Sequence, residues 1–294
     1  YMPSLAIDHR SEQLAYLAKQ AHQERLSSSF QQALANCIDL DTGNIRDQSL
    51  SFQQQRLVNE VYKDWKKWQA LPAAFLADYT KLISTATHFW QQAREQSDYT
   101  LFEPYLQQVC DMARQKAAYI DANKPVYDVL LDEFEPGYTH QQVQVLFDGL
   151  KQQCLPLLRQ LQQQPAVSPS LKGPFDDVKQ WQYTLDLLKQ MGFDFEKGRQ
   201  DKSTHPFTMD VAVNDVRVTT RLREDTVFEA ITSTIHEGGH ALYEQGFLAE
   251  FQGTPLAEAV SLGIHESQSR FWENHVCKTE AFWEGQWPKL QHLF

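Results

Sequence analysis

Helical periodicity dominates the first 164 residues of this chain. Between residues 11 and 38, apolar side chains recur at mostly three- and four-residue intervals, which places them on one face of a helix. This stretch predicts one amphipathic helix, or two helices joined near residues 27–29. Similar patterns predict further helices over about 49–70, 73–97, 101–122 and 139–164. The sequence therefore predicts a mainly α-helical fold.

The pattern changes after residue 164. The Pro- and Ser-rich segment PAVSPSLKGP (165–174) predicts a loop, and a further helix is expected to run through Trp181 and Met191. Residues 207–222 then alternate apolar and polar side chains on both sides of Asn214-Asp215. Two short alternating runs around such a turn predict a β-hairpin. This is the only strand signal that the sequence offers.

No repeat and no clear linker divides the chain. We therefore expect one domain over residues 1–294, with a helical portion at 1–164 and the hairpin and remaining helices at 165–294. The formal net charge of −11 argues against a nucleic-acid partner, because an acidic protein repels phosphate backbones. We also expect no membrane partner, since no apolar run approaches the roughly 18 residues that span a bilayer. Four widely spaced cysteines predict free thiols and a cytoplasmic location.

Residues 233–246, STIHEGGHALYEQG, carry the clearest chemical signal. A capping box at Thr226 and Glu229 predicts that the helix around them begins near residue 227, and Gly246 predicts its end. His236 and His240 are four residues apart, so they project from one face of that helix, one turn apart. Two imidazoles at this separation can bind one Zn²⁺ ion, and the pattern HExxH is that of zinc metallopeptidases.

Glu237 follows the first of these histidines directly. Its carboxylate is expected to lie beside the metal and to take a proton from metal-activated water as the general base, without binding the metal itself. Gly238 and Gly239 fill the turn between the histidines although glycine is a poor helix former. We interpret the missing side chains as room for a neighbouring strand or a bound substrate to approach closely.

A catalytic zinc site needs a third protein ligand and an open position. The extended motif with a third histidine is absent, because Gly246 and Tyr243 occupy its other positions. A glutamate on a later helix is the alternative. On spacing alone the candidates are Glu266, Glu273 and Glu258, and Glu266 could equally form an i,i+4 pair with Arg270.

The segments HEGGHALYEQG and GIHESQSRFWEN resemble the two hallmark motifs of the M32 family of metallocarboxypeptidases, the carboxypeptidase Taq type. Similar segments are EQLAYLA, LLDEFEPGYT, MGFDFEKGRQDKSTHPFT and DVRVTTR, so the resemblance covers nearly the whole chain. It implies a helical zincin fold like that of neurolysin and angiotensin-converting enzyme, with a small hairpin or sheet beside the active-site helix. The implied activity is zinc-dependent release of C-terminal amino acids from peptides.

The resemblance also assigns residues. It implies His236, His240 and Glu266 as the zinc ligands and Glu237 as the general base. One Zn²⁺ per chain is expected, with other divalent ions such as Co²⁺ able to replace it. Substrate binding or support of the ligands is the expected role of three further residues: His205, Arg217 and His265. The implied partners are peptides with a free C-terminus and a second copy of the chain in a homodimer.

The chain departs from the family pattern at both ends. It starts at Tyr1 and stops 28 positions after Glu266, whereas members of the family are expected to continue. We therefore expect a fragment that lacks the extreme N-terminus and the C-terminal part, and that exposes apolar surface. Two alternatives stay open: a zinc endopeptidase or oligopeptidase of the same clan, and a catalytically incomplete helical fragment.

Overall fold

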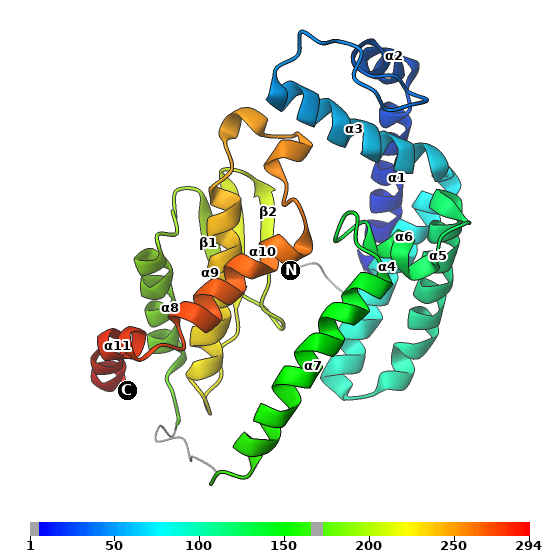
Figure 1. Ribbon diagram of the computed structural model, residues 1–294. Coiled ribbons are helices and arrows are strands. Elements are labelled where there is room, and N and C mark those ends of the chain that lie inside the picture. The colour runs from blue at the N-terminus through cyan, green and yellow to red at the C-terminus, as the bar shows by residue number, and fades with distance from the viewer. Residues whose placement is uncertain (1–5, 166–172) are drawn as a thin grey trace. The chain divides into compact units, whose positions relative to one another are not determined.

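The structure is a computed structural model that describes residues 6–165 and 173–294. Its described part is mainly α-helical with a small three-stranded sheet (Figure 1), which confirms the predicted fold class. The chain divides into two compact units, one formed by Tyr1–Glu133 with Gly137–Gln142 and the other by Phe134–Pro136 with Val143–Phe294. The single domain expected over residues 1–294 stays a prediction, as does the likeness to neurolysin.

Helices that follow one another along the chain build the first unit. They are α1 (Ile7–Arg25), α2 (Ser28–Cys37), α3 (Phe52–Ala70), α4 (Ala73–Gln96), the short 3₁₀-helix η2 (Tyr99–Leu101), α5 (Glu103–Asp121) and α6 (Val126–Leu131). Helix α4 packs against α1 and against α5. The periodic stretch at 11–38 is thus two helices, and the hydroxyl of Ser27 caps the second by accepting a hydrogen bond from Phe30 N. Helix α6 was not predicted, because six residues are too few to show a helical period.

The second unit begins with most of a long helix and ends at the C-terminus. Its elements are α7 (His140–Gln162), α8 (Asp177–Met191), β1 (Gly198–Lys202), β2 (Thr208–Ala212), β3 (Asp215–Thr220), α9 (Phe228–Gln245), the 3₁₀-helices η3 (Ala249–Phe251) and η4 (Pro255–Ala257), α10 (Leu262–Arg270), the π-helical turn η5 (Phe271–Val276) and α11 (Glu280–Leu293). The loop predicted at 165–174 lies mostly outside the described residues.

Helix α7 exposes much of its apolar face. Phe147 and Leu150 are about half exposed, and Leu157 and Leu161 are exposed further along the helix. The expected exposed apolar surface is therefore present on this helix. Apolar patches of this kind are typical of surfaces that another polypeptide covers.

The sheet contains the predicted hairpin and one strand that was not predicted. Strands β2 and β3 pair in antiparallel fashion around residues 213–214, and β1 pairs with β3 in parallel, giving the order β1-β3-β2. No sequence pattern predicted β1, but the implied fold allowed a small hairpin or sheet, and the structure contains a three-stranded sheet. The β1 sequence, GRQDK, is polar and lacks an alternating apolar pattern, so it is held chiefly by the ladder to β3. A side chain at Gly198 would collide with the carbonyl oxygen of Val216, which makes glycine necessary there.

Helix α9 begins where the sequence predicted, but its N-terminus is different. The predicted capping box does not form: Thr226 accepts a hydrogen bond from Phe228 N, and no side chain caps residue 227. Glu229 instead forms ion pairs with Arg221 and Arg223 at the end of the sheet. These arginines compete for the carboxylate that a capping box would need.

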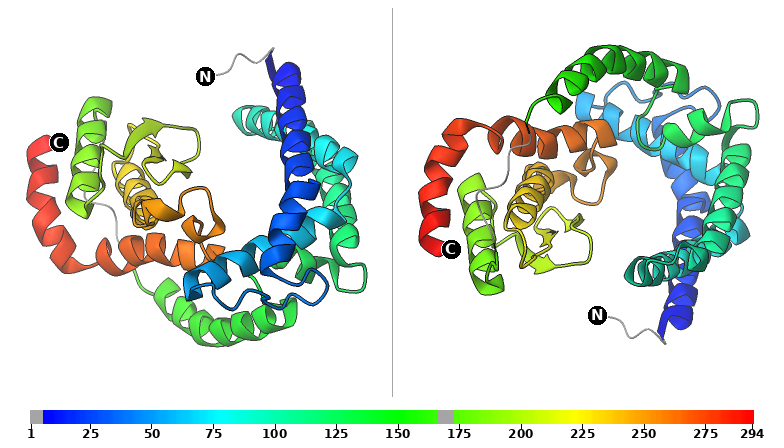
Figure 2. Two further views of the ribbon diagram at one scale, coloured as in Figure 1. Left: turned by 90° about the horizontal axis from the view of Figure 1, so that it is seen from above. Right: turned by 90° about the horizontal axis from the view of Figure 1, so that it is seen from below.

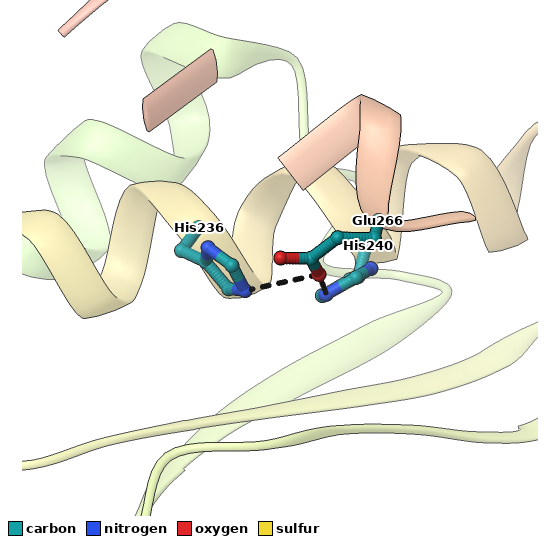
Figure 3. A group of neighbouring side chains, drawn as sticks. All are labelled: His236, His240 and Glu266. Atoms are coloured by element: carbon teal, nitrogen blue, oxygen red, sulfur yellow. Dashed lines mark ion pairs between the residues drawn. The ribbon is translucent and has the colours of Figure 1, made fainter. Parts of the chain in front are cut away.

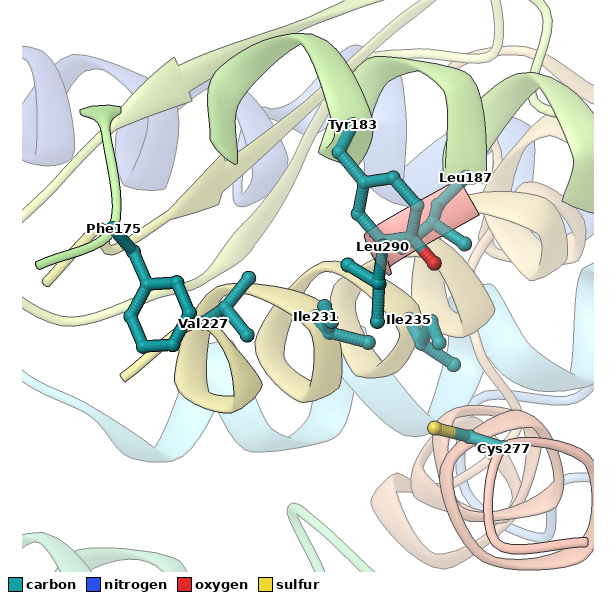
Figure 4. Close-up of a cluster of buried hydrophobic side chains, with 8 residues drawn as sticks. All are labelled: Phe175, Tyr183, Leu187, Val227, Ile231, Ile235, Cys277 and Leu290. Carbon is teal, nitrogen blue, oxygen red and sulfur yellow. The ribbon is translucent and has the colours of Figure 1, made fainter. Parts of the chain in front are cut away.

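Helix α9 lies between the sheet, α8 and α10 (Figure 1), and both views in Figure 2 show the same neighbours. Its apolar ridge of Val227, Ile231 and Ile235 is fully buried in a core shared with α8, η5 and α11 (Figure 4). The other members of this core are Phe175, Tyr183, Leu187, Cys277 and Leu290. Because this face of α9 is buried in the core, only the other faces of the helix are available to form a functional site.

In the described part of the chain, no helix combines the length and the apolar character that crossing a membrane requires.

Candidate metal centre

Two helices bring three candidate ligands together. His236 and His240 project from α9, and Glu266 projects from α10 toward them (Figure 3). Glu266 Oε2 lies 3.2 Å from His240 Nε2 and 3.6 Å from His236 Nε2. Among the described residues, these three side chains form a group that could hold a metal ion, because one ligand atom of each lies within 4.8 Å of the others.

The donor set fits a catalytic zinc ion. Two imidazole nitrogens and one carboxylate oxygen form the His₂Glu set of zinc peptidases, which leaves a fourth position for water or substrate. Ligand atoms at about 2.0–2.1 Å from a tetrahedral ion lie roughly 3.3 Å from one another. The separations of 3.2 Å and 3.6 Å are close to this value. A small divalent ion can therefore be bound here with little movement of the side chains.

Glu273 supports His236 from behind. Its Oε2 atom lies 2.8 Å from His236 Nδ1, and its side chain is mostly buried. The sequence also offered Glu273 as a candidate for the third ligand, but Glu273 contacts Nδ1 of His236, the nitrogen that points away from Glu266. A carboxylate in this position fixes the tautomer and orientation of a ligating histidine. Glu258, the remaining candidate, is exposed and lies outside the group.

Glu266 uses its two oxygens differently. Oε2 faces the histidines, whereas Oε1 accepts a hydrogen bond of 2.7 Å from Nε of Arg270. The i,i+4 pair that the sequence suggested as an alternative thus coexists with the approach to the histidines. Burial raises the pKa of Glu266, but hydrogen bonds from Arg270 and Ser269 outweigh burial and leave the pKa below its usual value. An ionised carboxylate is the form that binds a cation.

His240 is held in the neutral form that metals require. Burial, and then the neighbouring His265 and His236, lower the pKa of His240 to about 4. Its lone pair is therefore available at neutral pH.

Glu237 is buried beside the same centre. It is 7% exposed, and its Oε2 atom accepts a hydrogen bond of 2.8 Å from the hydroxyl of Thr208 on β2. Burial raises the pKa of Glu237, and the Thr208 hydroxyl opposes that rise. A raised pKa makes a carboxylate a stronger base, which suits a group that must take a proton from water. Thr208 itself was missed, since nothing in the sequence pairs it with the helix.

A cavity of about 590 Å³ opens over these groups. It is lined by Phe207, Thr208, Glu237, His240, Leu262, Gly263, His265 and Glu266. One wall comes from the edge strand β2 and the other from α10. The cavity thus joins the proposed base, two of the three candidate ligands and an exposed strand edge.

The three further site residues lie in different places. His265 lines the cavity, and its ring centroid is 4.4 Å from that of His240. His205 is exposed, and its charge when protonated favours the ionised form of Glu237. Arg217 lies on the exposed side of β3, where Nε and Nη2 donate to both carboxylate oxygens of Asp215. The structure therefore brings His265 to the centre but does not bring Arg217 there.

The two glycines of α9 mark close packing between helices. A Cβ atom at Gly239 would lie 2.6 Å from the Cα atom of Ser269, in the backbone of α10. A Cβ at Gly238 would meet the tips of Leu188 and Met191 on α8. The expectation of a close approach is correct, but the partners are helices, neither a strand nor a substrate. Gly239 lets α10 come near enough for Glu266 to reach the histidines.

Comparison with known proteins points to one family. Residues 1–294 match the family model described as carboxypeptidase Taq (M32) metallopeptidase. Among curated proteins, thermostable carboxypeptidase 1 of Thermus thermophilus is 35% identical over 305 residues, which cover 100% of this chain and 59% of the relative. Carboxypeptidase 1 of Bacillus subtilis is 38% identical over 249 residues, covering 84% of this chain and 50% of the relative.

Solved structures agree with the sequence relatives. The crystal structure of M32 carboxypeptidase from Deinococcus radiodurans R1 has a TM-score of 0.86 at 33% identity, covering 100% of this chain and 58% of that one. A structure described as BsuCP has a TM-score of 0.93 at 33% identity with the same coverage. The chain therefore spans between half and three fifths of the length of these relatives.

Proposed function

Because the chain belongs to the carboxypeptidase Taq (M32) family of metallopeptidases, we propose that its metal centre serves the release of C-terminal amino acids from peptides. The observation that carries this proposal is the meeting of His236, His240 and Glu266 at one point, with the buried Glu237 in the same cavity. The curated relatives are named carboxypeptidases, which favours this activity over an endopeptidase.

His236, His240 and Glu266 would hold Zn²⁺, and we expect that Co²⁺ can bind there in its place. When bound, zinc supplies a Lewis acid that polarises the scissile carbonyl and lowers the pKa of a water molecule. His236 and Glu266 would be held in place by their own partners, Glu273 and Arg270. The ligand set thus needs little reorganisation during the reaction.

Glu237 is the proposed general base. Its carboxylate would take a proton from the attacking water and pass this proton to the leaving amine. The Thr208 hydroxyl holds Oε2 of Glu237 by a hydrogen bond of 2.8 Å and so orients the carboxylate. A peptide along the edge strand β2 would be held extended by main-chain hydrogen bonds.

A carboxypeptidase must also recognise a free carboxylate, for which a cation is the usual partner. Arg217, expected from the sequence, is engaged by Asp215 and exposed. A comparison between an N-blocked dipeptide and its C-terminal amide therefore tests the carboxylate preference directly. The proposal predicts hydrolysis of the acid and little hydrolysis of the amide, in the presence of Zn²⁺. Equal hydrolysis, or preference for the amide, contradicts the carboxypeptidase assignment.

The variant Glu237→Gln tests the proton transfer. Loss of a positioned general base typically costs a factor of about 10² to 10⁴, so we expect a loss of at least 10²-fold with metal binding retained. Glu250→Gln, a change of an exposed glutamate on η3, is the matched control and should retain the full rate. Full activity in Glu237→Gln contradicts the proposed base. A chain that binds zinc without hydrolysing either dipeptide contradicts the proposed activity and leaves the metal centre intact.

A homodimer and a cytoplasmic location also stay proposals. Light scattering of the purified chain over a range of concentrations measures its oligomeric state. A constant mass of one chain contradicts the homodimer.

A further inference from the structure

Glu244 is a buried carboxylate for which the proposed reaction has no use. It lies on α9 one turn after His240 and is 6% exposed. A buried carboxylate is costly unless an opposite charge or a hydrogen-bond donor faces it. Its Oε1 atom lies 2.9 Å from Nε2 of His265 on α10, although the ring N–H does not point straight at the carboxylate. This close contact joins α9 to α10, the two helices that carry the candidate ligands.

Two aromatic rings contact His265 in addition to the carboxylate of Glu244. Its ring is tilted by 34° against the ring of His240, with centroids 4.4 Å apart. Tyr243 meets the ring of His265 at 72°, with centroids 5.3 Å apart. Glu244 and Tyr243 on α9 therefore restrain His265, which in turn lies against His240.

We propose that Glu244 and His265 act as a positioning pair that holds the ring of His240 and sets its distance to Glu266. This inference rests on the proposed metal centre. His265 precedes Glu266 directly on α10, and Glu244 follows His240 by one turn on α9. The contact between Glu244 and His265 therefore restrains their neighbours, His240 and Glu266, relative to each other.

The pair has a counterpart on the other side of the centre. Glu273 contacts His236 at 2.8 Å, and the close contact of Gly239 with Ser269 lies between the two pairs. Helix α9 is thus joined to the continuous segment of α10 and η5 by three successive contacts, and the candidate ligands lie between these contacts. Loss of the contact between Glu244 and His265 should loosen His240 and leave His236 in place.

Co²⁺ binding tests the proposal on the intact chain. The variants are Glu244→Leu, which removes the charge at similar volume, and His265→Phe, which keeps a ring against His240. We expect each to lower Co²⁺ affinity by about 10-fold and to shift the visible absorption bands of bound Co²⁺. Because both variants break one pair, the double variant should lose no more affinity than either single variant. Glu244→Gln, which keeps shape and polarity, should lose less, and Glu250→Gln should lose nothing.

A purely structural pair would behave differently. It would lower the melting temperature of the metal-free chain without changing Co²⁺ affinity or the spectrum of bound Co²⁺, and that result overturns the proposal. Additive losses in the double variant overturn it as well. Should Glu244→Leu fail to fold, unchanged affinity and spectrum in His265→Phe also overturn it. Failure of the unsubstituted chain to bind one Co²⁺ would instead contradict the proposed metal centre, so the two failures are distinct.

Discussion

Nδ1 of His236 lies 2.8 Å from Oε2 of Glu273, two helical turns beyond Glu266 on the next helical segment. This contact leaves Nε2 of His236 directed at Glu266. One short stretch of chain, residues 266–273, thus supplies both a candidate ligand and the group that orients another ligand. The sequence places the two glutamates seven residues apart, which is close to two turns of a helix.

Glu273→Gln should weaken metal binding without unfolding the chain. The amide keeps the shape of the carboxylate but cannot supply the negative charge that orients and strengthens His236. Changes of this kind typically cost 10- to 100-fold in metal affinity. Competition with a chelator measures the affinity, and Glu284→Gln, an exposed change on α11, serves as the control. Equal affinities of the two variants would refute the role given to Glu273.

Gly239→Ala should separate the two ligand-bearing helices. The new Cβ would lie 2.6 Å from Ser269 Cα, so backbone must move, at a cost of about 1–3 kcal/mol in the free energy of unfolding. Gly285→Ala on α11 is the matched control, because no heavy atom lies within 4 Å of its Cβ position. There alanine should stabilise the chain by up to about 1 kcal/mol through helix propensity. Denaturant unfolding measures both, and stabilisation by Gly239→Ala would contradict the close contact.

Helix periodicity explains how much of this fold the sequence could predict. Long amphipathic helices such as α3 and α4 repeat the same pattern over five or more turns, so their existence is readable. Strand β1 was missed because its stability comes from pairing with β3, which leaves no pattern in GRQDK. The N-terminus of α9 was misread because Arg221 and Arg223 attract Glu229 away from the cap.

The same limit applies to the site. HExxH predicts two ligands and a base because one helical turn relates them, and this relation is local. Glu244 stands four residues after His240, so helical spacing could have placed it on the same face. The hydrogen bond from Thr208 to Glu237 joins a strand to a helix, and no spacing in the sequence reveals it.

Cys277 should be protected from thiol reagents in the native state. It is 2% exposed in the core around α9, and burial raises the pKa of its thiol to about 11. Thiolates are the reactive form, so modification at pH 8 should be slow. Cys110 and Cys154 are exposed and should react at once. Mass spectrometry after timed labelling distinguishes the three, and rapid labelling of Cys277 in the folded chain would contradict the core.

Asp39 should make the stability of the first unit depend on pH. The guanidinium of Arg46, at 2.6 Å, and the backbone of Thr42 hold the pKa of Asp39 well below its usual value. A depressed pKa in the folded state adds stability above the unfolded pKa of about 3.9 and loses it as the pH falls. Asp39→Asn should therefore lower the melting temperature at pH 7, with a difference that shrinks below about pH 4.

The exposed neighbour Asp41 provides the control for this change. Asp41→Asn should leave the melting temperature nearly unchanged at pH 7 and at pH 3. A difference between Asp39→Asn and the unsubstituted chain that stays constant from pH 7 to pH 3 would exclude the charge of Asp39 as its cause.

We propose above all that His236, His240 and Glu266 together bind one metal ion. Isothermal titration of the metal-free chain with Zn²⁺, in parallel with Glu266→Gln, tests this claim most directly. The account predicts one Zn²⁺ per unsubstituted chain and a loss of at least 10-fold in affinity for Glu266→Gln. Binding of less than one ion by the unsubstituted chain, or equal affinity in both proteins, would contradict it.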